Sequence, residues 1–582
     1  MSRNDEIADL LEEFADLLEA QDVSYKPRAY RDAAENVRAY HRPIEELAEE
    51  GQDAVEEIDK VGDAIASKIV EYLTTGTIDE LEALRDEMPV EMGALTSVEG
   101  VGPKTVGALY EALGIETLDE LEAAAEAGEI QEVKGFGAKT EQNILDAIPF
   151  ARQTQERELL GEARPLADSV LAYFATVESA ERAEVAGSIR RWRETIGDVD
   201  VLVASESGES VVEAFTDWPE TDSVIEAGES KASVRAGGVR VDLRVVVPDE
   251  FGAALQYFTG SKEHNVHLRN VAIDRGLKIN EYGIFDVSEV EHVDDGQRVG
   301  ERLGGRTEAE IYDELDLPVF PPEMREDTGE IEAAMDGSLP DPIAEGTLRG
   351  DLHTHTDWSD GNNTIAEMAA AAAERGYEYH VVSDHATGPG MVGGVGLDDD
   401  RLREQIDAVA EAAADAEIPI LHGVETNIDK AGGLSTDDDL LAELDVVVAS
   451  PHAALDQDRE TATDRIVAAI EHPSVDVVGH PTGRILNRRP GLPLDYERVA
   501  AAAADHDTAL EINASPYRLD LSGEAIKFAV QAGAQVAINT DAHSPGELDH
   551  ARYGIHTARR GWATEADVVN TRDLDGLRDF LH

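Results

Sequence analysis

The sequence predicts a multidomain chain with an α-helical amino-terminal region, a central α+β domain and a carboxy-terminal (βα)7 barrel. A glycine-containing motif recurs three times between residues 58 and 144, and carboxylate-bearing strands occur near residues 200 and 242. From residue 348 onward, seven apolar strand cores alternate with Ala-rich stretches. A chain of 582 residues is too long for one hydrophobic core. The expected domains cover 1–85, 86–150, 151–320 and 348–582, with a linker rich in Pro, Gly and acidic residues at 321–347.

Cysteine is absent, which excludes disulfides and thiolate metal sites and is typical of a reducing cytoplasm. The chain has neither a signal-peptide pattern nor an apolar run of about 18 residues. We therefore expect a soluble cytoplasmic protein with no membrane partner, and we expect it to act as a monomer.

The net charge is strongly negative, because 123 acidic residues face 49 Lys and Arg for a formal charge of -74. Taken alone, this charge argues against a nucleic-acid partner. The acidic residues are spread over the whole chain, which favours an adaptation to a salt-rich cytosol and indicates a halophilic host. Any DNA binding must then depend on backbone N–H groups, metal ions and a few arginines.

The amino-terminal region is expected to be helical, since apolar residues recur at helical spacing over 7–18. The repeated motif reads apolar-x-Gly-apolar-Gly and then a helix, with copies at 58–69, 98–107 and 133–144. Glycines let the backbone approach a phosphate, and the next helix offers free N–H groups. The pattern indicates helix-hairpin-helix motifs that bind the DNA backbone; the alternative is ordinary turns between core helices. The candidate DNA-binding glycines are Gly62, Gly100, Gly102, Gly135 and Gly137. The first copy is irregular, because Lys60 replaces its first glycine.

Three carboxylates lie on two predicted strands of the central domain. Valines alternate with Asp198 and Asp200, so these two carboxylates share one face of a strand, and a second strand at 239–246 carries Asp242. If the strands are neighbours, the carboxylates converge and need a cation such as Mg²⁺. Two ions about 3.5–4 Å apart would suit a phosphoryl transfer. A Gly-Ser pair at 187–188 can present N–H and hydroxyl groups to phosphates. The alternative is a surface strand with solvated aspartates.

The order of these motifs resembles the family X DNA polymerases, whose best-known member is polymerase beta, over about residues 1–320. The motifs are Gly-Ser-x-Arg-Arg from 187, Gly-Asp-x-Asp from 197, Asp-Leu-Arg from 242, Tyr-Phe-Thr-Gly-Ser from 257 and Asn-Glu-Tyr from 280. The resemblance implies a nucleotidyltransferase palm and thumb at 151–320. It also implies that Asp198, Asp200 and Asp242 are the catalytic ligands of Mg²⁺ or Mn²⁺.

The same resemblance implies a set of substrate-binding residues. They are Gly187, Ser188, Arg191, Tyr257, Phe258, Gly260, Asn265 and Arg269. Ser188 and Arg191 would contact the triphosphate. Tyr257 and Phe258 would pack against the sugar and discriminate against ribose. Asn265 would reach the base and Arg269 the templating strand. The alternatives are core aromatic residues and a solvated arginine.

Lys68 is a candidate catalytic residue for a second activity. It falls on the helix after the first hairpin, where this family carries a Schiff-base lysine that removes 5′-deoxyribose phosphate. The alternative is a solvated lysine on an exposed helix face, and the irregular hairpin before it weakens the resemblance.

The carboxy-terminal strand cores lie near 350, 381, 420, 446, 477, 510 and 536. This pattern predicts a barrel like the (β/α)8 fold but one unit short, with its chemistry at the carboxyl ends of the strands. The polar residues there are His353, His355, Asp360, His385, Glu425, His452, His480, Asp541 and His543. Imidazole and carboxylate ligands suit Zn²⁺, Mn²⁺ or Fe²⁺, and nine such groups could hold up to three ions. His380 and His422 stand alone and are expected to be core residues.

The barrel motifs resemble the polymerase-and-histidinol-phosphatase (PHP) domain over 348–582. They are Asp-Leu-His-Thr-His from 351, Ser-Asp-Gly from 359, Ser-Asp-His from 383, Gly-Val-Glu from 423, Ser-Pro-His from 450, Gly-His-Pro from 479 and Thr-Asp-Ala-His from 540. By this resemblance one ion would be shared by His353, His355, Glu425 and Asp541. A second would be held by Glu425, His452 and His480, and a third by Asp360, His385 and His543.

Together the two resemblances indicate a gap-filling DNA repair polymerase that uses deoxynucleoside triphosphates on gapped or nicked DNA. The barrel would act as a metal-dependent 3′–5′ exonuclease, with cuts at abasic sites as a further expectation. Two alternatives remain open: a DNA-end-binding scaffold with a vestigial polymerase core, and a small-molecule phosphatase of the histidinol-phosphate type.

Overall fold

The computed structural model describes residues 3–581 except for 24, 25, 39, 41, 43, 57, 59, 99, 156 and 392–394. The chain divides into two compact units. One comprises Met1–Arg157 with Asn487–Arg489, and the other Glu158–Leu486 with Pro490–His582. No helix in the described part of the chain is long and apolar enough to span a membrane.

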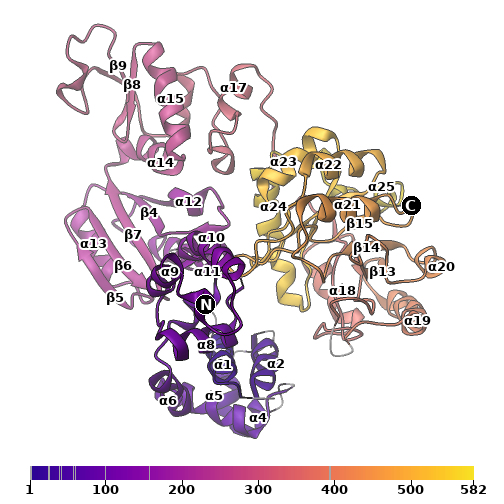
Figure 1. Ribbon diagram of the computed structural model, residues 1–582. Helices are drawn as coiled ribbons and strands as arrows, with labels where there is room; N and C mark the ends of the chain where they lie inside the picture. Colours follow the sequence, from indigo (N-terminus) through magenta and orange to yellow (C-terminus); the bar gives the residue numbers. More distant parts are fainter. Residues whose placement is uncertain are drawn as a thin grey trace. The chain divides into compact units, whose positions relative to one another are not determined.

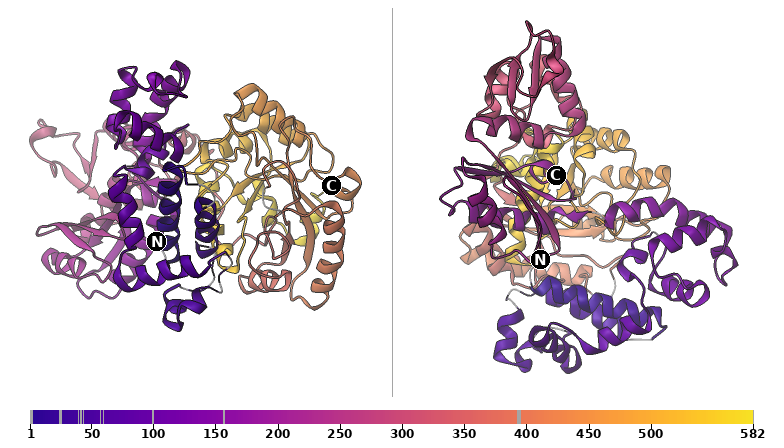
Figure 2. Two further views of the ribbon diagram at one scale, coloured as in Figure 1. Left: turned by 60° about the horizontal axis from the view of Figure 1, so that its bottom comes forward. Right: turned by 90° about the vertical axis from the view of Figure 1, so that its left-hand side faces the viewer.

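The amino-terminal unit is built from helices, as predicted, and Figure 2 shows it in indigo and purple. The helices are α1 Arg3–Ala20, α2 Lys26–Arg38, α3 Ile44–Glu50, α4 Gln52–Val55, α5 Asp63–Thr75, α6 Asp79–Glu87, α7 Met92–Thr96, α8 Pro103–Leu113, α9 Leu118–Glu126, η1 Ile130–Glu132 and α10 Ala138–Gln155. The apolar positions of α1, among them Ile7, Leu11 and Phe14, are buried in one core with those of the later helices. Helical spacing therefore produced the face on which the unit assembles.

The three repeated motifs adopt the same backbone turn. Lys60, Gly100 and Gly135 have φ angles of 62°, 83° and 103°, all in the left-handed region. A left-handed φ is unfavourable for lysine, so the first copy keeps the turn geometry of the glycine copies at a conformational cost. Gly62 and Gly102 then form the N-caps of α5 and α8.

The second unit begins with a five-stranded sheet, in the order β2-β4-β7-β6-β5. Its strands are β2 Arg182–Val185, β4 Val199–Ala204, β5 Ser223–Ala227, β6 Lys231–Ala236 and β7 Val239–Val246. Helices α11 Leu160–Phe174, α12 Gly187–Arg190 and α13 Gly208–Thr216 accompany the sheet, and short strands β1 Glu158–Leu159 and β3 Thr195–Ile196 pair beside it. β4 and β7 are parallel neighbours, so the two predicted carboxylate strands are adjacent.

A smaller α+β part follows, with a three-stranded antiparallel sheet in the order β10-β9-β8. Its elements are η2 Pro248–Glu250, α14 Phe251–Thr259, α15 Lys262–Asp274, β8 Leu277–Asn280, β9 Gly283–Asp286, η3 Val293–Asp295, β10 Glu301–Gly304, α16 Glu308–Asp313, η4 Pro322–Met324 and α17 Glu330–Met335. The segment predicted as a linker contains η4 and α17. Arg325 in this segment is fully buried and pairs with Glu308, so its first half packs against the folded domain and is not a free tether.

The carboxy-terminal part contains seven parallel strands in sequence order, as predicted. Figure 1 shows this part in salmon to yellow, with β13, β14 and β15 labelled. The strands are β11 Gly350–Asp351, β12 Tyr379–Val382, β13 Ile420–Asn427, β14 Val446–Ser450, β15 Val477–Val478, β16 Ala509–Asn513 and β17 Val536–Asn539. The helices are α18 Ile365–Glu374, α19 Asp399–Asp415, α20 Asp438–Leu441, α21 Arg459–Ile470, α22 Tyr496–Asp505, α23 Gly523–Ala532, η5 Pro545–His550, α24 Ala551–Arg560, η6 Glu565–Asp567, η7 Val569–Thr571 and α25 Leu574–Arg578. A parallel bridge between Thr354 and Ala542 joins the first and last strand ends, so the barrel is nearly closed.

Two candidate metal centres

The first centre lies where β4 and β7 run side by side. Asp200 is the register partner of Asp242, and neighbouring strands lie about 4.8 Å apart. Asp198 stands two residues before Asp200, immediately ahead of β4, and lies close enough to raise the pKa of Asp200. The structure thus brings together the carboxylates that the sequence placed on two separate strands, well inside the span that one or two hard cations can bridge.

The electrostatics of this centre favour a cation. Burial and the neighbouring carboxylates of Asp198 and Asp242 raise the pKa of Asp200 to about 7, against weaker opposing effects of Arg244 and Arg191. Three carboxylates in one partly desolvated place repel one another, and a divalent ion relieves that repulsion. The donor set, which consists only of carboxylate oxygens, fits Mg²⁺ or Mn²⁺.

Gly187 lets the predicted phosphate-binding turn pack against this centre. Its φ is 60°, and a Cβ placed on it would lie 2.1 Å from Oδ2 of Asp200. Only glycine fits there, so the backbone of the Gly-Ser turn packs directly against the carboxylate. Ser188 follows on α12. The predicted phosphate-binding turn and the predicted metal ligand Asp200 therefore lie directly beside each other.

Arg190 and Arg191 have different partners in the structure. Arg190 donates to both carboxylate oxygens of Glu308, at 2.9 and 2.8 Å. Arg191 donates from Nε to Glu326 at 2.9 Å and from Nη1 to the carbonyl of Thr259 at 2.7 Å. Arg190 is thus committed to a structural ion pair, whereas the Arg191 guanidinium is anchored at one side.

A pocket opens beside the carboxylates. Its lining includes Asp200, Asp242, Glu226, Lys231, Ser233, Arg240, Arg244 and Phe258. Arg240 donates from Nε to Oδ1 of Asp242 at 2.8 Å, and Arg244 lies over the Phe258 ring at 4.3 Å. Sequence reasoning missed Arg240, although it stands two residues before Asp242 on the same strand, where side chains share a face. The pocket is therefore lined by both carboxylates and cations, as a site for a metal–phosphate complex requires.

The remaining predicted nucleotide-binding residues lie around the end of α14. Tyr257 and Phe258 contact each other edge to face, with ring centroids 5.1 Å apart. Asn265 donates from its side-chain amide to the carbonyls of Tyr257 and Gly260 at 2.7 and 3.1 Å, so this amide stabilises the backbone at the end of α14. Arg269 is exposed on α15. Phe258 and Asp242 line one pocket, while Arg269 is not part of that lining.

In the amino-terminal unit, a Cβ added at any of the five motif glycines would meet no atom of the described residues within 4 Å. The backbone at Gly62, Gly100, Gly102, Gly135 and Gly137 is thus open to a ligand.

Lys68 on α5 pairs with Glu80 at 2.7 Å, and only 14% of its side chain is exposed. Burial lowers the pKa of Lys68, but Glu80 and Tyr30 outweigh burial and raise it overall. Its amine is therefore held in the protonated form.

The second centre lies at the carboxyl ends of the barrel strands. All nine predicted ligands converge there, and Glu425 on β13 is central and fully buried. Its Oε2 lies 3.4 Å from His353 and 2.6 Å from His385, and its Oε1 lies 3.3 Å from His452 and 3.0 Å from His480. His355 approaches Asp541 to 3.0 Å. The clusters that the structure forms around Glu425 are His353, His355 and Glu425, and His385, Glu425 and His452. They overlap the first two predicted groups but add His385, which the PHP resemblance places in the third.

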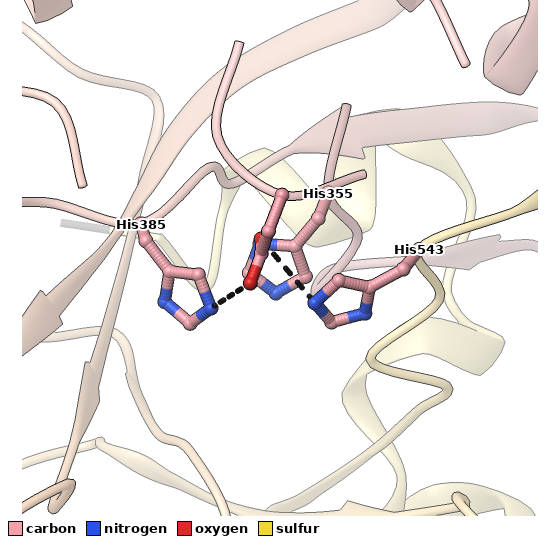
Figure 3. A group of neighbouring side chains, drawn as sticks. His355, His385 and His543 are labelled. Atoms are coloured by element: carbon pink, nitrogen blue, oxygen red, sulfur yellow. Dashed lines mark ion pairs between the residues drawn. The ribbon is translucent and has the colours of Figure 1, made fainter. Parts of the chain in front are cut away.

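The third group surrounds Asp360. Its carboxylate lies 3.5 Å from Nε2 of His385 and 3.4 Å from Nε2 of His543. Figure 3 shows His355, His385 and His543 directed toward a common point. His355, Asp360, His385 and His543 each offer a ligand atom within 4.8 Å of the others. This cluster contains one residue more than the predicted third group, because His355 lies between two clusters.

The barrel residues fit bound metal ions. Three buried ring nitrogens of the cluster have no hydrogen-bond partner among the described residues: His353 Nε2, His355 Nδ1 and His480 Nδ1. Burial raises the pKa of Glu425, but the surrounding histidines, His385 and His353 foremost, hold it well below its usual range. An ionised carboxylate among unpartnered imidazole nitrogens is a donor set for Zn²⁺, Mn²⁺ or Fe²⁺.

Residues outside the predicted set orient these ligands. Glu511 on β16 is fully buried and accepts from Nδ1 of His353 at 2.7 Å and from the N–H of His480 at 2.6 Å. Asn427 lies 2.7 Å from Nδ1 of His452 in the same way. A hydrogen bond at one ring nitrogen leaves the other free for a metal ion. A glutamate inside the apolar strand core near 510 was the signal that could have revealed Glu511.

The two histidines set apart in the sequence lie outside the metal clusters. His380 is buried and lies 3.2 Å from the Thr354 hydroxyl, and His422 bonds Gln405 at 3.0 Å. Burial lowers the pKa of each to about 4. Both are therefore neutral residues of the protein interior.

Four family models match the chain. A helix-hairpin-helix domain matches residues 2–78, a SAM-like helix-hairpin-helix tandem 92–148, the DNA polymerase beta thumb 254–326 and the PHP domain 351–515. A Bacillus subtilis (strain 168) protein named "DNA polymerase/3'-5' exonuclease PolX" is 35% identical over 581 residues, which cover 99% of each chain. DNA polymerase lambda of Rattus norvegicus is 26% identical over 55% of this chain and 56% of its own. A protein of Thermoanaerobacter sp. (strain X514) named as a probable phosphatase is 32% identical over 40% of this chain and 93% of its own.

Proposed function

The chain belongs to the family X DNA polymerases that carry helix-hairpin-helix and PHP domains, and we propose that it fills short gaps in DNA and removes 3′-terminal nucleotides. The full-length match to a protein named as a DNA polymerase and 3′–5′ exonuclease supports both activities in one chain. The relative named as a probable phosphatase covers only 40% of this chain, which makes a small-molecule phosphatase the weaker interpretation.

In the palm, Asp198, Asp200 and Asp242 would hold Mg²⁺ or Mn²⁺. Such ions acidify the primer 3′-hydroxyl and stabilise the departing pyrophosphate. Ser188 and Arg191 would bind the triphosphate beside them. Arg240 donates to Asp242 and would fix the orientation of that carboxylate. Tyr257 and Phe258 would contact the sugar, Asn265 the base and Arg269 the template.

In the barrel, the nine histidine and carboxylate ligands would hold up to three ions of Mn²⁺ or Zn²⁺. Such ions act as Lewis acids and activate water for phosphodiester hydrolysis. Glu511 and Asn427 would keep His353 and His452 in the ligating tautomer. Cleavage at abasic sites is a further activity that this chemistry permits.

The helical unit would grip DNA through its three hairpins. Their glycine backbones are open, and each motif directly precedes a helix, whose N-terminus favours a phosphate. Lys68 would form a Schiff base with 5′-deoxyribose phosphate once its pairing with Glu80 is broken, since only a neutral amine attacks a carbonyl. This combination would serve base excision repair.

The cellular location, the substrates and the oligomeric state are part of the same proposal. We place the enzyme in the cytoplasm, on gapped or nicked DNA, with deoxynucleoside triphosphates as substrates and as a monomer. The formal charge of -74 favours a halophilic host, so the activity should persist in concentrated salt.

The observation that carries the proposal is the parallel register of Asp200 with Asp242, beside a turn at Gly187 that leaves no room for a side chain. The test is incubation with gapped DNA and Mn²⁺ in concentrated salt, with and without nucleotides. Asp242→Ala should abolish gap filling and leave 3′ degradation, and His353→Ala should do the reverse. Gap filling that survives Asp242→Ala would overturn the polymerase assignment. Release of free phosphate from small phosphomonoesters, without nucleotide release from DNA, would favour the phosphatase instead.

A further inference from the structure

We infer that the PHP barrel is part of the polymerase's nucleotide site: Arg560 and Glu326 are positioning residues that hold Arg191 ready for the triphosphate. This inference rests on the proposed function, because it takes Arg191 as a ligand of the nucleotide. It concerns contacts between the palm and the barrel, which belong to one compact unit.

The segment after the phosphate-binding turn is built against the barrel. Trp192 stacks on His556 of α24 with ring centroids 3.6 Å apart and planes 6° from parallel. The carboxylate of Glu194 accepts hydrogen bonds from Nη2 and Nη1 of Arg484, at 2.9 and 3.3 Å. Arg560, at the end of α24, donates to the carbonyl of Arg191 at 3.2 Å. These three attachments thus fix the backbone that carries Arg191.

The palm and the barrel also share a hydrophobic core. Leu519 and Tyr553 of the barrel belong to the same buried cluster as Ile189 and Trp192 of the palm. Trp192 has a φ of 52°, an unfavourable conformation for a bulky residue that the surrounding packing must maintain. The conformation of residues 191–194 is therefore a property of the joined palm and barrel.

One carboxylate connects Arg191 to the barrel arginine. Oε1 of Glu326 lies 2.9 Å from Nε of Arg191 and 3.5 Å from Nη1 of Arg560. Burial raises the pKa of Glu326, but Arg191, Arg193 and Arg560 lower it overall, so the carboxylate is ionised. A shared anion between two guanidiniums keeps them close despite their like charge.

The arrangement leaves one edge of the Arg191 guanidinium available. Nε is bonded to Glu326 and Nη1 to the carbonyl of Thr259, and no atom of the described residues bonds Nη2. A planar guanidinium held at two nitrogens has little rotational freedom left to lose when a phosphate binds. Loss of the Arg560 anchor should therefore weaken nucleotide binding without touching the metal ligands.

The test compares Arg560→Ala with Arg559→Ala in the full-length enzyme. Arg559 is the adjacent residue of α24 and pairs with Glu323, so it controls for losing a guanidinium from the end of this helix without removing a direct contact of Arg191. Single-turnover gap filling at increasing nucleotide concentration separates the nucleotide dissociation constant from the maximal rate. We expect Arg560→Ala to raise the dissociation constant about tenfold, the effect of one lost charge-assisted hydrogen bond, and Arg559→Ala to change it less than about twofold.

Three further measurements exclude a general structural defect. The 3′–5′ exonuclease rate of Arg560→Ala should equal that of the wild type, Arg560→Lys should recover part of the affinity, and Glu326→Gln should weaken binding as Arg560→Ala does. An unchanged dissociation constant in Arg560→Ala, with an active wild type, would overturn this inference and leave the proposed function intact. A wild type that incorporates no nucleotide would overturn both.

Discussion

Asp200 and Asp242 face each other in register across the parallel strands β4 and β7. The pKa of Asp200 is raised to about 7 by burial and by Asp198 and Asp242, so a cation at this centre must displace a proton below that pH. We predict that Mg²⁺ affinity at the palm rises with pH, by up to about tenfold per unit, until about pH 7 and then levels off. Calorimetric titration of Mg²⁺ at several pH values measures this. Subtracting the Mg²⁺ binding of Asp242→Asn from that of the wild type separates binding at the palm from binding at the barrel. If this difference in Mg²⁺ binding does not change with pH, the prediction is wrong.

Gly187→Ala should disable synthesis. The new Cβ would lie 2.1 Å from Oδ2 of Asp200, and the φ of 60° would be strained for alanine, so the carboxylate or the turn must move. A displacement of about 1 Å in a catalytic group can cost about a hundredfold in rate. Gap filling should fall by at least that factor while 3′ degradation continues. Gly546→Ala is the control, because a Cβ there meets nothing within 4 Å; equal activity of the two variants would refute the argument.

Glu511→Gln should weaken metal binding in the barrel about 10- to 100-fold. The amide still fills the space but no longer accepts from His353 and His480 as an anion, so the ligating tautomer of His353 loses its support. Binding of Mn²⁺ followed by electron paramagnetic resonance reports this directly, with exonuclease activity as a second readout. Asp476→Asn is the control for stability, because it neutralises another buried carboxylate, which accepts a hydrogen bond from the N–H of Val447. Wild-type Mn²⁺ affinity in Glu511→Gln would assign Glu511 a structural role only.

Glu80→Gln should make Lys68 a better nucleophile. Burial lowers the pKa of Lys68, and pairing with Glu80 at 2.7 Å is the first effect that raises it, so removing that charge lowers the pKa and frees more neutral amine near neutral pH. Borohydride trapping of the chain on 5′-deoxyribose phosphate DNA should increase. Lys68→Ala should show no trapping; undiminished trapping in that variant would place the Schiff base on another lysine.

Much of the architecture could be predicted from local pattern. The seven strand cores predicted near residues 350 to 536 correspond to β11–β17, because apolar runs between Ala-rich helices leave one arrangement of parallel strands. Helical spacing in the first 18 residues likewise gave α1 its buried face. The turn at Lys60 was the uncertain case, and the structure shows it with the same left-handed φ as Gly100.

Other features had no local signal. Arg240 is an ordinary strand residue until the sheet brings its guanidinium to Asp242. Glu326 lies in a segment with the composition of a linker, and only its contact with Arg191 reveals a role. The link from Arg560 to Arg191 spans more than half of the chain.

The sequence by itself determined which chemical groups this protein carries: three carboxylates on or beside two strands, nine candidate barrel ligands and three glycine-containing motifs, since strand and helix periodicities are local properties of the chain. Only the tertiary structure decided which groups share a partner. Register between β4 and β7 and packing of α24 against the palm arise from contacts between distant segments, and ion pairs and pKa values depend on those distances.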